Sequence, residues 1–135
     1  MKITEIEEVY FEYAFCMMEI AKSRKQKYNG YKEKPERFCF YTDAAGAERH
    51  EVFGGNPDRA LSIKFGFQVD LSPDKHRELQ ANITPWAQVE NAKWRATYQR
   101  VYMDCREGDG MSEQEALQDW MNLIGRNYIE ELMPE

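Results

Sequence analysis

The chain has 135 residues, of which 42% are hydrophobic and 31% are charged, and its formal net charge is -6. This length and apolar content suffice for a buried core without a metal or a disulfide, and the acidic balance argues against general nucleic-acid binding through counterion release. No apolar run reaches the ~18 residues that span a bilayer and no signal-peptide pattern is present, so we expect a cytoplasmic protein that does not contact a membrane.

The first predicted element is a helix from Glu5 to about Tyr28. Thr4 and Glu7 form a capping box at its start, and residues 29–30 (Asn-Gly) end it. Its apolar residues fall on two faces, of which one faces the core. The second face is either covered by the protein's own chain or forms an interface with a partner or a second copy. This second face consists of Phe11, Phe15 and Met18.

A basic segment follows at residues 21–37, where the local charge balance is +5. Aromatic residues lie between its cations. Cations that neutralise phosphate and aromatic faces that stack on bases are the two elements a nucleotide or single strand requires. The alternative is a solvated helix end, whose cations interact favourably with the helix dipole. The residues that would form the nucleotide site are Arg24, Lys25, Lys27, Tyr28, Tyr31 and Lys32.

Three strands are predicted next. Residues 37–42 and 48–53 flank a five-residue connection that contains Gly46, which predicts a β-hairpin. From Leu61 to Leu71 apolar and polar residues alternate strictly. This alternation predicts a strand in an antiparallel sheet with one buried and one solvated face.

Helices are predicted for the rest of the chain. Ser or Thr followed by Pro starts a short helix over 73–80 and a longer one over 85–106. The β-favouring residues 94–102 leave a strand as the alternative for part of the longer helix. Ser112 and Glu115 form a second capping box, which starts a last helix. The apolar stripe of this last helix consists of Leu117, Trp120, Met121, Ile124, Tyr128 and Leu132.

The chain shows no linker and no internal repeat. The sequence therefore predicts one α+β domain over residues 1–135. Its order is an N-terminal helix, a three-stranded antiparallel sheet, a short helix and two C-terminal helices.

Residues for catalysis are few. The two histidines, His50 and His76, would make a metal site only if the fold brought them together. The three cysteines are widely spaced without a CxxC pair, and Walker, dinucleotide and nucleophile-elbow motifs are absent from the sequence. We therefore expect no metal, no cofactor and no enzymatic activity, with a scattered catalytic site as the minor alternative.

Four polar residues of the penultimate helix fall within a narrow arc. Two guanidinium groups that flank an amide and a phenol would suit a phosphate or carboxylate clamp. The alternative is an ordinary polar shoulder of the helix. The row consists of Arg95, Gln99, Tyr102 and Arg106.

Residues 105–135 are acidic, with a local balance of -6. The predicted final helix places Asp119 and Glu130 away from its apolar stripe, and the early acids stabilise its N-terminus. The region is either an ordinary solvated face or a docking surface that meets a basic patch or imitates nucleic acid. The candidate contact residues are Glu113, Asp119 and Glu130.

Without an assembled catalytic set, we expect a non-enzymatic protein that binds and occludes a macromolecular partner, most simply another protein. In size, acidity and lack of motifs the chain resembles small accessory proteins of phages and mobile elements, which include anti-CRISPR and anti-restriction inhibitors of host defence systems. No residue motif carries this resemblance. The alternative is a protein that binds a small ligand, such as a nucleotide or nucleotide messenger, and acts as an oligomer whose interfaces form the pocket.

Overall fold

The computed structural model describes residues 34–55 and 58–132. Within these ranges, four α-helices and one two-stranded antiparallel sheet give an α+β fold. The predicted N-terminal helix and the six predicted nucleotide-binding residues between 24 and 32 lie outside the described residues, and the single domain stays a prediction. In chain order the elements are η1 (Lys34–Glu36), β1 (Glu48–Glu51), α2 (Asp58–Phe65), β2 (Gln68–Leu71), α3 (Pro73–Ala81), α4 (Pro85–Gly108), α5 (Glu113–Ile124) and η2 (Glu130–Leu132).

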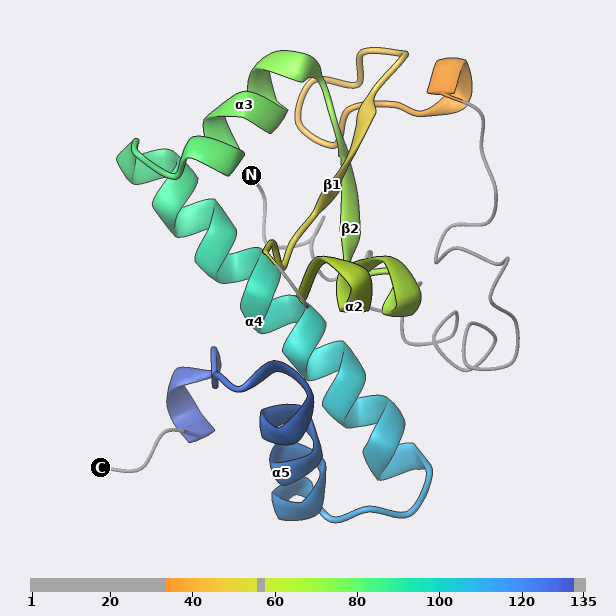
Figure 1. Ribbon diagram of the computed structural model, residues 1–135, viewed down its shortest axis with the longest axis vertical. Helices are drawn as coiled ribbons and strands as arrows, with labels where there is room; N and C mark the ends of the chain where they lie inside the picture. Colours follow the sequence, from red (N-terminus) through yellow and green to blue (C-terminus); the bar gives the residue numbers. More distant parts are fainter. Residues whose placement is uncertain (1–33, 56–57, 133–135) are drawn as a thin grey trace.

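The long helix α4 is the element against which the others are arranged. Helix α3 packs near its start and α5 packs beside its second half (Figure 1). The Thr84 hydroxyl accepts a hydrogen bond from the Ala87 amide at 3.1 Å, and Pro85 occupies the first turn. The predicted starts of α3 and α4 are thus confirmed, and residues 94–102 are helical. None of the described helices is long and apolar enough to cross a membrane.

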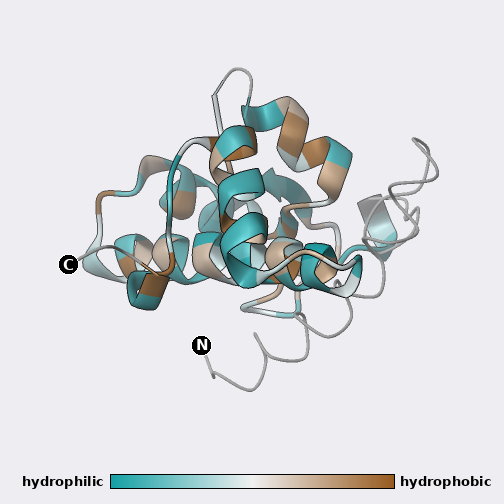
Figure 2. Cartoon of the chain, turned by 90° about the horizontal axis from the view of Figure 1, so that it is seen from below, coloured by the Kyte–Doolittle hydropathy of each residue, from teal (hydrophilic) through white to brown (hydrophobic). Residues whose placement is uncertain are grey.

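An aromatic core lies between the sheet, α4 and α5. Phe67, Tyr98 and Trp120 are fully buried. The Phe53 ring lies 5.5 Å from the Phe67 ring and 5.4 Å from the Trp120 ring, between centroids, and both contacts are edge-on. Such aromatic pairs contribute about 0.5–1.5 kcal/mol beyond their area burial. Hydrophobic and hydrophilic residues are interspersed along the helices (Figure 2), as is typical of helices that bury one side.

The predicted hairpin between residues 37–42 and β1 is wrong. Strand β1 pairs antiparallel with β2 instead. Within 37–42, Phe38 forms one isolated bridge with Ala45, and Phe40 packs edge-on against Trp94 of α4 with the ring centroids 4.9 Å apart. Aromatic burial against α4 has therefore replaced strand pairing in this segment.

The predicted strand from Leu61 to Leu71 is also wrong in its first half, because the segment divides into α2 and β2. Gly66 has a φ of +75°, a left-handed conformation that glycine adopts readily and that separates the two elements. Ser62, predicted to be solvated, is buried, and its hydroxyl bonds both backbone groups of Phe53 at 3.0 and 2.8 Å. Ile63, predicted to be buried, is 43% exposed. A helix buries residues three and four apart, so the alternation carries no meaning in α2.

The start of the last helix is confirmed and its end is wrong. The Ser112 hydroxyl accepts from the Glu115 amide, and the Glu115 carboxylate accepts from the Ser112 amide, each at 3.1 Å. Helix α5 ends at Ile124 because Gly125 adopts a φ of +86° at the C-cap. Glu130 therefore lies on η2 and not on a continuous helix.

Candidate functional site

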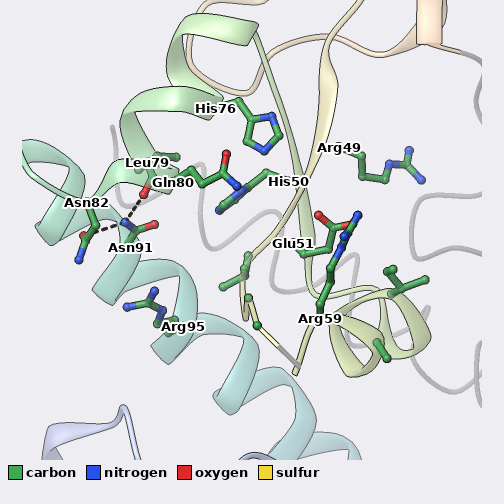
Figure 3. A pocket seen from close by; sticks show the side chains of 15 residues that line it. Arg49, His50, Glu51, Arg59, His76, Leu79, Gln80, Asn82, Asn91 and Arg95 are labelled. Carbon is green, nitrogen blue, oxygen red and sulfur yellow. Dashed lines mark hydrogen bonds and ion pairs between the residues drawn. The ribbon is translucent and has the colours of Figure 1, made fainter. Parts of the chain in front are cut away.

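The described residues contain a cleft of about 920 Å³ between β1, α2, α3 and the first half of α4 (Figure 3). We call it the His50–His76 cleft. Its basic and imidazole side consists of Arg49, His50, Arg59, His76 and Arg95. Its amide side consists of Gln80, Asn82 and Asn91, and its apolar side of Val52, Ala60, Ile63 and Leu79. Glu51 is the carboxylate among these described lining residues.

The fold brings the two histidines together, which is the condition that the sequence left open. His50 lies on β1 and His76 on α3, and their ring centroids are 5.1 Å apart in an edge-to-face arrangement. Their proximity follows from the topology, since β2 pairs with β1 and leads almost directly into α3. The His76 Nδ1 atom lies 3.1 Å from Glu48 Oε1, and this contact orients the His76 ring.

The two imidazoles occupy different environments. Burial lowers the pKa of His50 from 6.5 to about 4, and the nearby His76 and Arg95 act in the same direction. His50 is therefore neutral at pH 7, and it is 9% exposed. Within the described residues no group of three or more His, Cys, Asp or Glu side chains could hold a metal ion. Neutral His50 has one ring nitrogen that donates a hydrogen bond and one that accepts it.

Arg95 differs from the other cations of the cleft. Arg49 Nε lies 3.1 Å from Asp70, and Arg59 Nε lies 3.8 Å from Glu51. Arg95 is half-buried and, among the described residues, forms no ion pair within 4.0 Å. Its guanidinium carbon lies 6.0 Å from the centre of the Tyr128 ring. An arginine without a counter-ion in a concave site attracts anions and offers bidentate donors to them.

Amide side chains fix the wall between α3 and α4. Asn91 Nδ2 donates to the Leu79 carbonyl at 2.8 Å and to Asn82 Oδ1 at 2.9 Å. Asn82 holds a φ of 54° at the C-cap of α3, a conformation that asparagine tolerates well. These bonds tie the two helices together at one end of the His50–His76 cleft.

The predicted row on α4 is not brought together as a clamp. Gln99 is fully buried, where its Oε1 accepts from the Tyr128 amide at 2.6 Å and its Nε2 donates to Asn127 Oδ1 at 2.8 Å. Tyr102 is 3% exposed, and its hydroxyl donates to Asp119 Oδ2 at 2.6 Å. Both side chains therefore hold α5 and the segment after it against α4.

Arg106 also holds α5 against α4. Its Nε lies 3.1 Å from Asp119 Oδ2, and its Nη1 lies 3.8 Å from Asp109 Oδ2. Asp119 was predicted to face away from the core, but it contacts α4, because it is adjacent to the buried Trp120 on the helix surface. Of the four residues in the row, Arg95 is the one that lines the cleft.

Carboxylates gather near the connection from α4 to α5. Burial raises the pKa of Asp104 to about 6, and the neighbouring Glu107 and Glu113 contribute to this rise. Glu113 is exposed, with Arg100 Nη1 3.8 Å from its carboxylate, and Glu130 is exposed on η2. The two exposed acids of the predicted contact set thus remain accessible, whereas Asp119 is engaged with α4.

No family model matches the chain, and neither a curated protein nor a solved structure matches it significantly. The sequence singled out His50, His76 and Arg95 separately, but it missed Glu48 and Asn91. No local signal marks those two residues, because their partners come from other elements of the fold.

Proposed function

We propose that the protein binds a small anionic ligand in the His50–His76 cleft, and that a nucleotide or nucleotide messenger is the chemical class that fits it. The observation that carries the proposal is the half-buried Arg95, which has no ion pair among the described residues and lines a cavity of about 920 Å³. Ligand pockets typically measure about 300–1,000 Å³ and combine apolar walls with a few convergent polar groups.

The lining supports each part of such a ligand. Arg95 supplies a planar donor pair for a phosphate. Arg59 is 69% exposed and pairs with Glu51 at 3.8 Å, and an exposed pair of this kind contributes only about 0–1 kcal/mol, so Arg59 is free to turn toward an anion. The apolar side of the cleft, with Val52 and Leu79, gives a surface for a ring. The neighbouring amides are suited to hydrogen bonds with the edge of that ring.

Thermal unfolding in the presence of anions tests the proposal. Adenosine and guanosine monophosphates, their cyclic forms, cyclic dinucleotides and pyrophosphate are added in turn. A ligand at a hundred times its Kd stabilises the native state by about 2.7 kcal/mol, which is a clear rise in Tm. Isothermal titration calorimetry then gives the Kd of each compound that raises Tm.

A matched pair of variants locates the site. Arg95→Gln should weaken binding at least tenfold, because it removes the charge without an ion pair. Arg126→Gln removes a charge from an exposed position after α5 that does not line the cleft, and it should leave the Kd unchanged. If no anion raises Tm, or if both variants weaken binding equally, the proposal is wrong.

A second candidate is the binding of a basic macromolecular partner, such as the target of an inhibitor protein. The favouring observation is the group of Asp104, Glu107 and Glu113, whose mutual repulsion helps to raise the pKa of Asp104. A basic patch on a partner would relieve this repulsion. Affinity purification with wild type and with a Glu107→Gln, Glu113→Gln variant tests the surface, and equal recovery of the partner would exclude this surface as the binding site.

The predicted homo-oligomer stays a prediction. Light scattering tests it against the monomer mass of 16.0 kDa.

A further inference from the structure

We propose that the His50–His76 cleft takes up one proton together with its anion, and that His50 binds this proton. The inference rests on the proposed anion site and adds its regulation by pH. It also narrows the ligand class to dianions such as phosphate monoesters. The observations that carry it are the contact between the two imidazole rings and the position of Arg95 beside them.

The geometry allows one proton on the pair and opposes two. Ring centroids 5.1 Å apart place two imidazolium charges in direct contact, and like charges at such a separation raise the free energy of the doubly protonated form. On one side of the pair, the His76 Nδ1 atom lies 3.1 Å from Glu48 Oε1. The geometry therefore opposes a second positive charge on the imidazole pair unless negative charge is added nearby.

The groups around His50 explain why its protonation depends on a bound anion. Among the described residues, His76 from α3 and Arg95 from α4 are the charged or titratable groups that act on His50, and both act against a positive charge. Across the sheet His50 is opposite Val69 of β2, which carries no charge. In the rest of the cleft, Glu51 of β1 and Arg59 of α2 pair with each other.

An anion that binds between Arg95 and the imidazoles reverses this balance. It neutralises Arg95 and adds a negative charge beside His50, so both changes raise the affinity of His50 for a proton. By thermodynamic reciprocity, protonation raises the affinity for the anion to the same extent. Arg95 and protonated His50 then provide two positive charges, which match a phosphate monoester dianion better than a carboxylate. For sulfate, which stays a dianion, the Kd should fall by up to tenfold for each pH unit as the pH falls from the raised midpoint of His50 toward about pH 4.

Nuclear magnetic resonance can follow this proton directly, since the chain contains two histidines. The Cε1–H signals of the untagged full chain are recorded from pH 4 to pH 8.5 without anion, with sulfate and with adenosine monophosphate. Sulfate is the decisive probe because it does not itself titrate in this range. We expect one histidine to titrate below pH 5 without anion, and its midpoint to rise by at least one pH unit with saturating sulfate. His76→Gln assigns the signals.

Calorimetry at pH 5 in two buffers with different ionisation enthalpies gives the number of protons taken up on binding sulfate, which should be about 0.4 or more. Arg95→Gln should abolish the sulfate-dependent change in the midpoint. If an anion binds and both histidine midpoints stay unchanged, the proton-coupled inference is wrong while the anion site stands. If neither sulfate nor adenosine monophosphate binds at any pH, the proposed function and this inference both fail.

Discussion

Two of the three arginines of helix α4 have opposite surroundings. Near the end of the helix, Arg106 Nε lies 3.1 Å from the Asp119 carboxylate and donates a hydrogen bond to the Tyr102 hydroxyl. In the first half of the helix, Arg95 faces the His50–His76 cleft and has no ion pair among the described residues. The polar side chains of Gln99, Tyr102 and Arg106, which we call the Arg106 region, all bond to other parts of the fold. Arg95, in contrast, keeps its charge and hydrogen-bond donors available in the cleft. The first arrangement stabilises a helix pair, and the second is suited to a ligand.

The largest expected change in stability comes from removing the buried amide side chain of Gln99. Gln99→Ala leaves the Tyr128 amide without its acceptor and removes one of the two donors to Asn127 Oδ1, and a buried group left unpaired costs about 1–3 kcal/mol. We expect a loss of about 2–3 kcal/mol in the free energy of unfolding, measured with urea. Gln114→Ala at an exposed position of α5 is the control and should change stability by less than about 0.5 kcal/mol. A loss no larger than that of the control would show that Gln99 does not hold this segment.

The next effect concerns pH and the cleft. The pKa of His50 falls from 6.5 to about 4 on folding. Between these two pH values, His50 is therefore protonated in the unfolded state and neutral in the native state. Stability contributed by neutral His50 is therefore complete well above pH 6.5 and is lost as the pH falls from 6.5 toward 4. Between pH 8 and pH 5 this loss amounts to about 2 kcal/mol. Urea unfolding of wild type and His50→Asn at both pH values isolates it, and equal pH dependence in the two proteins would contradict the shift.

A smaller effect is expected from a single hydroxyl in the Arg106 region. Tyr102→Phe keeps the buried ring but removes the donor to Asp119, and a hydrogen bond to a charged group contributes about 1.5 kcal/mol. The matched control is Tyr128→Phe, because the Tyr128 hydroxyl forms no hydrogen bond among the described residues. Thermal unfolding of both variants should show the loss for Tyr102 alone. Equal losses would mean that the hydroxyl at position 102 adds nothing specific.

The sequence predicted well those features that depend on neighbouring residues. The capping box of Ser112 and Glu115 and the Thr84–Pro85 start of α4 are confirmed because their hydrogen bonds form within a single turn. The alternation from Leu61 to Leu71 misled, because Gly66 ends a helix inside it and a buried serine replaces an apolar contact.

The cleft could not be predicted from local sequence patterns, because its residues come from segments far apart in the chain. His50 and His76 meet through the pairing of β1 with β2, and the sequence left the order of the strands open. The α4 row was recognised as polar, yet its division between a cleft and a helix contact depends on Asp119, Asn127 and Tyr128. Those partners come from segments that local patterns do not connect. Helical spacing places side chains on one face but does not say which of them is already bonded.

The smallest expected change in stability tests the comparison between the two arginines most directly. Arg95→Gln removes one of the charges that oppose protonation of His50 and breaks no ion pair among the described residues, so the free energy of unfolding at pH 7 should change by less than about 0.5 kcal/mol. Arg106→Gln removes the partner of Asp119 and should cost about 1 kcal/mol. Anion binding should respond in the reverse order, lost in Arg95→Gln and kept in Arg106→Gln. A stability loss in Arg95→Gln as large as that in Arg106→Gln would assign Arg95 a structural role and leave the cleft without its principal anion-binding charge.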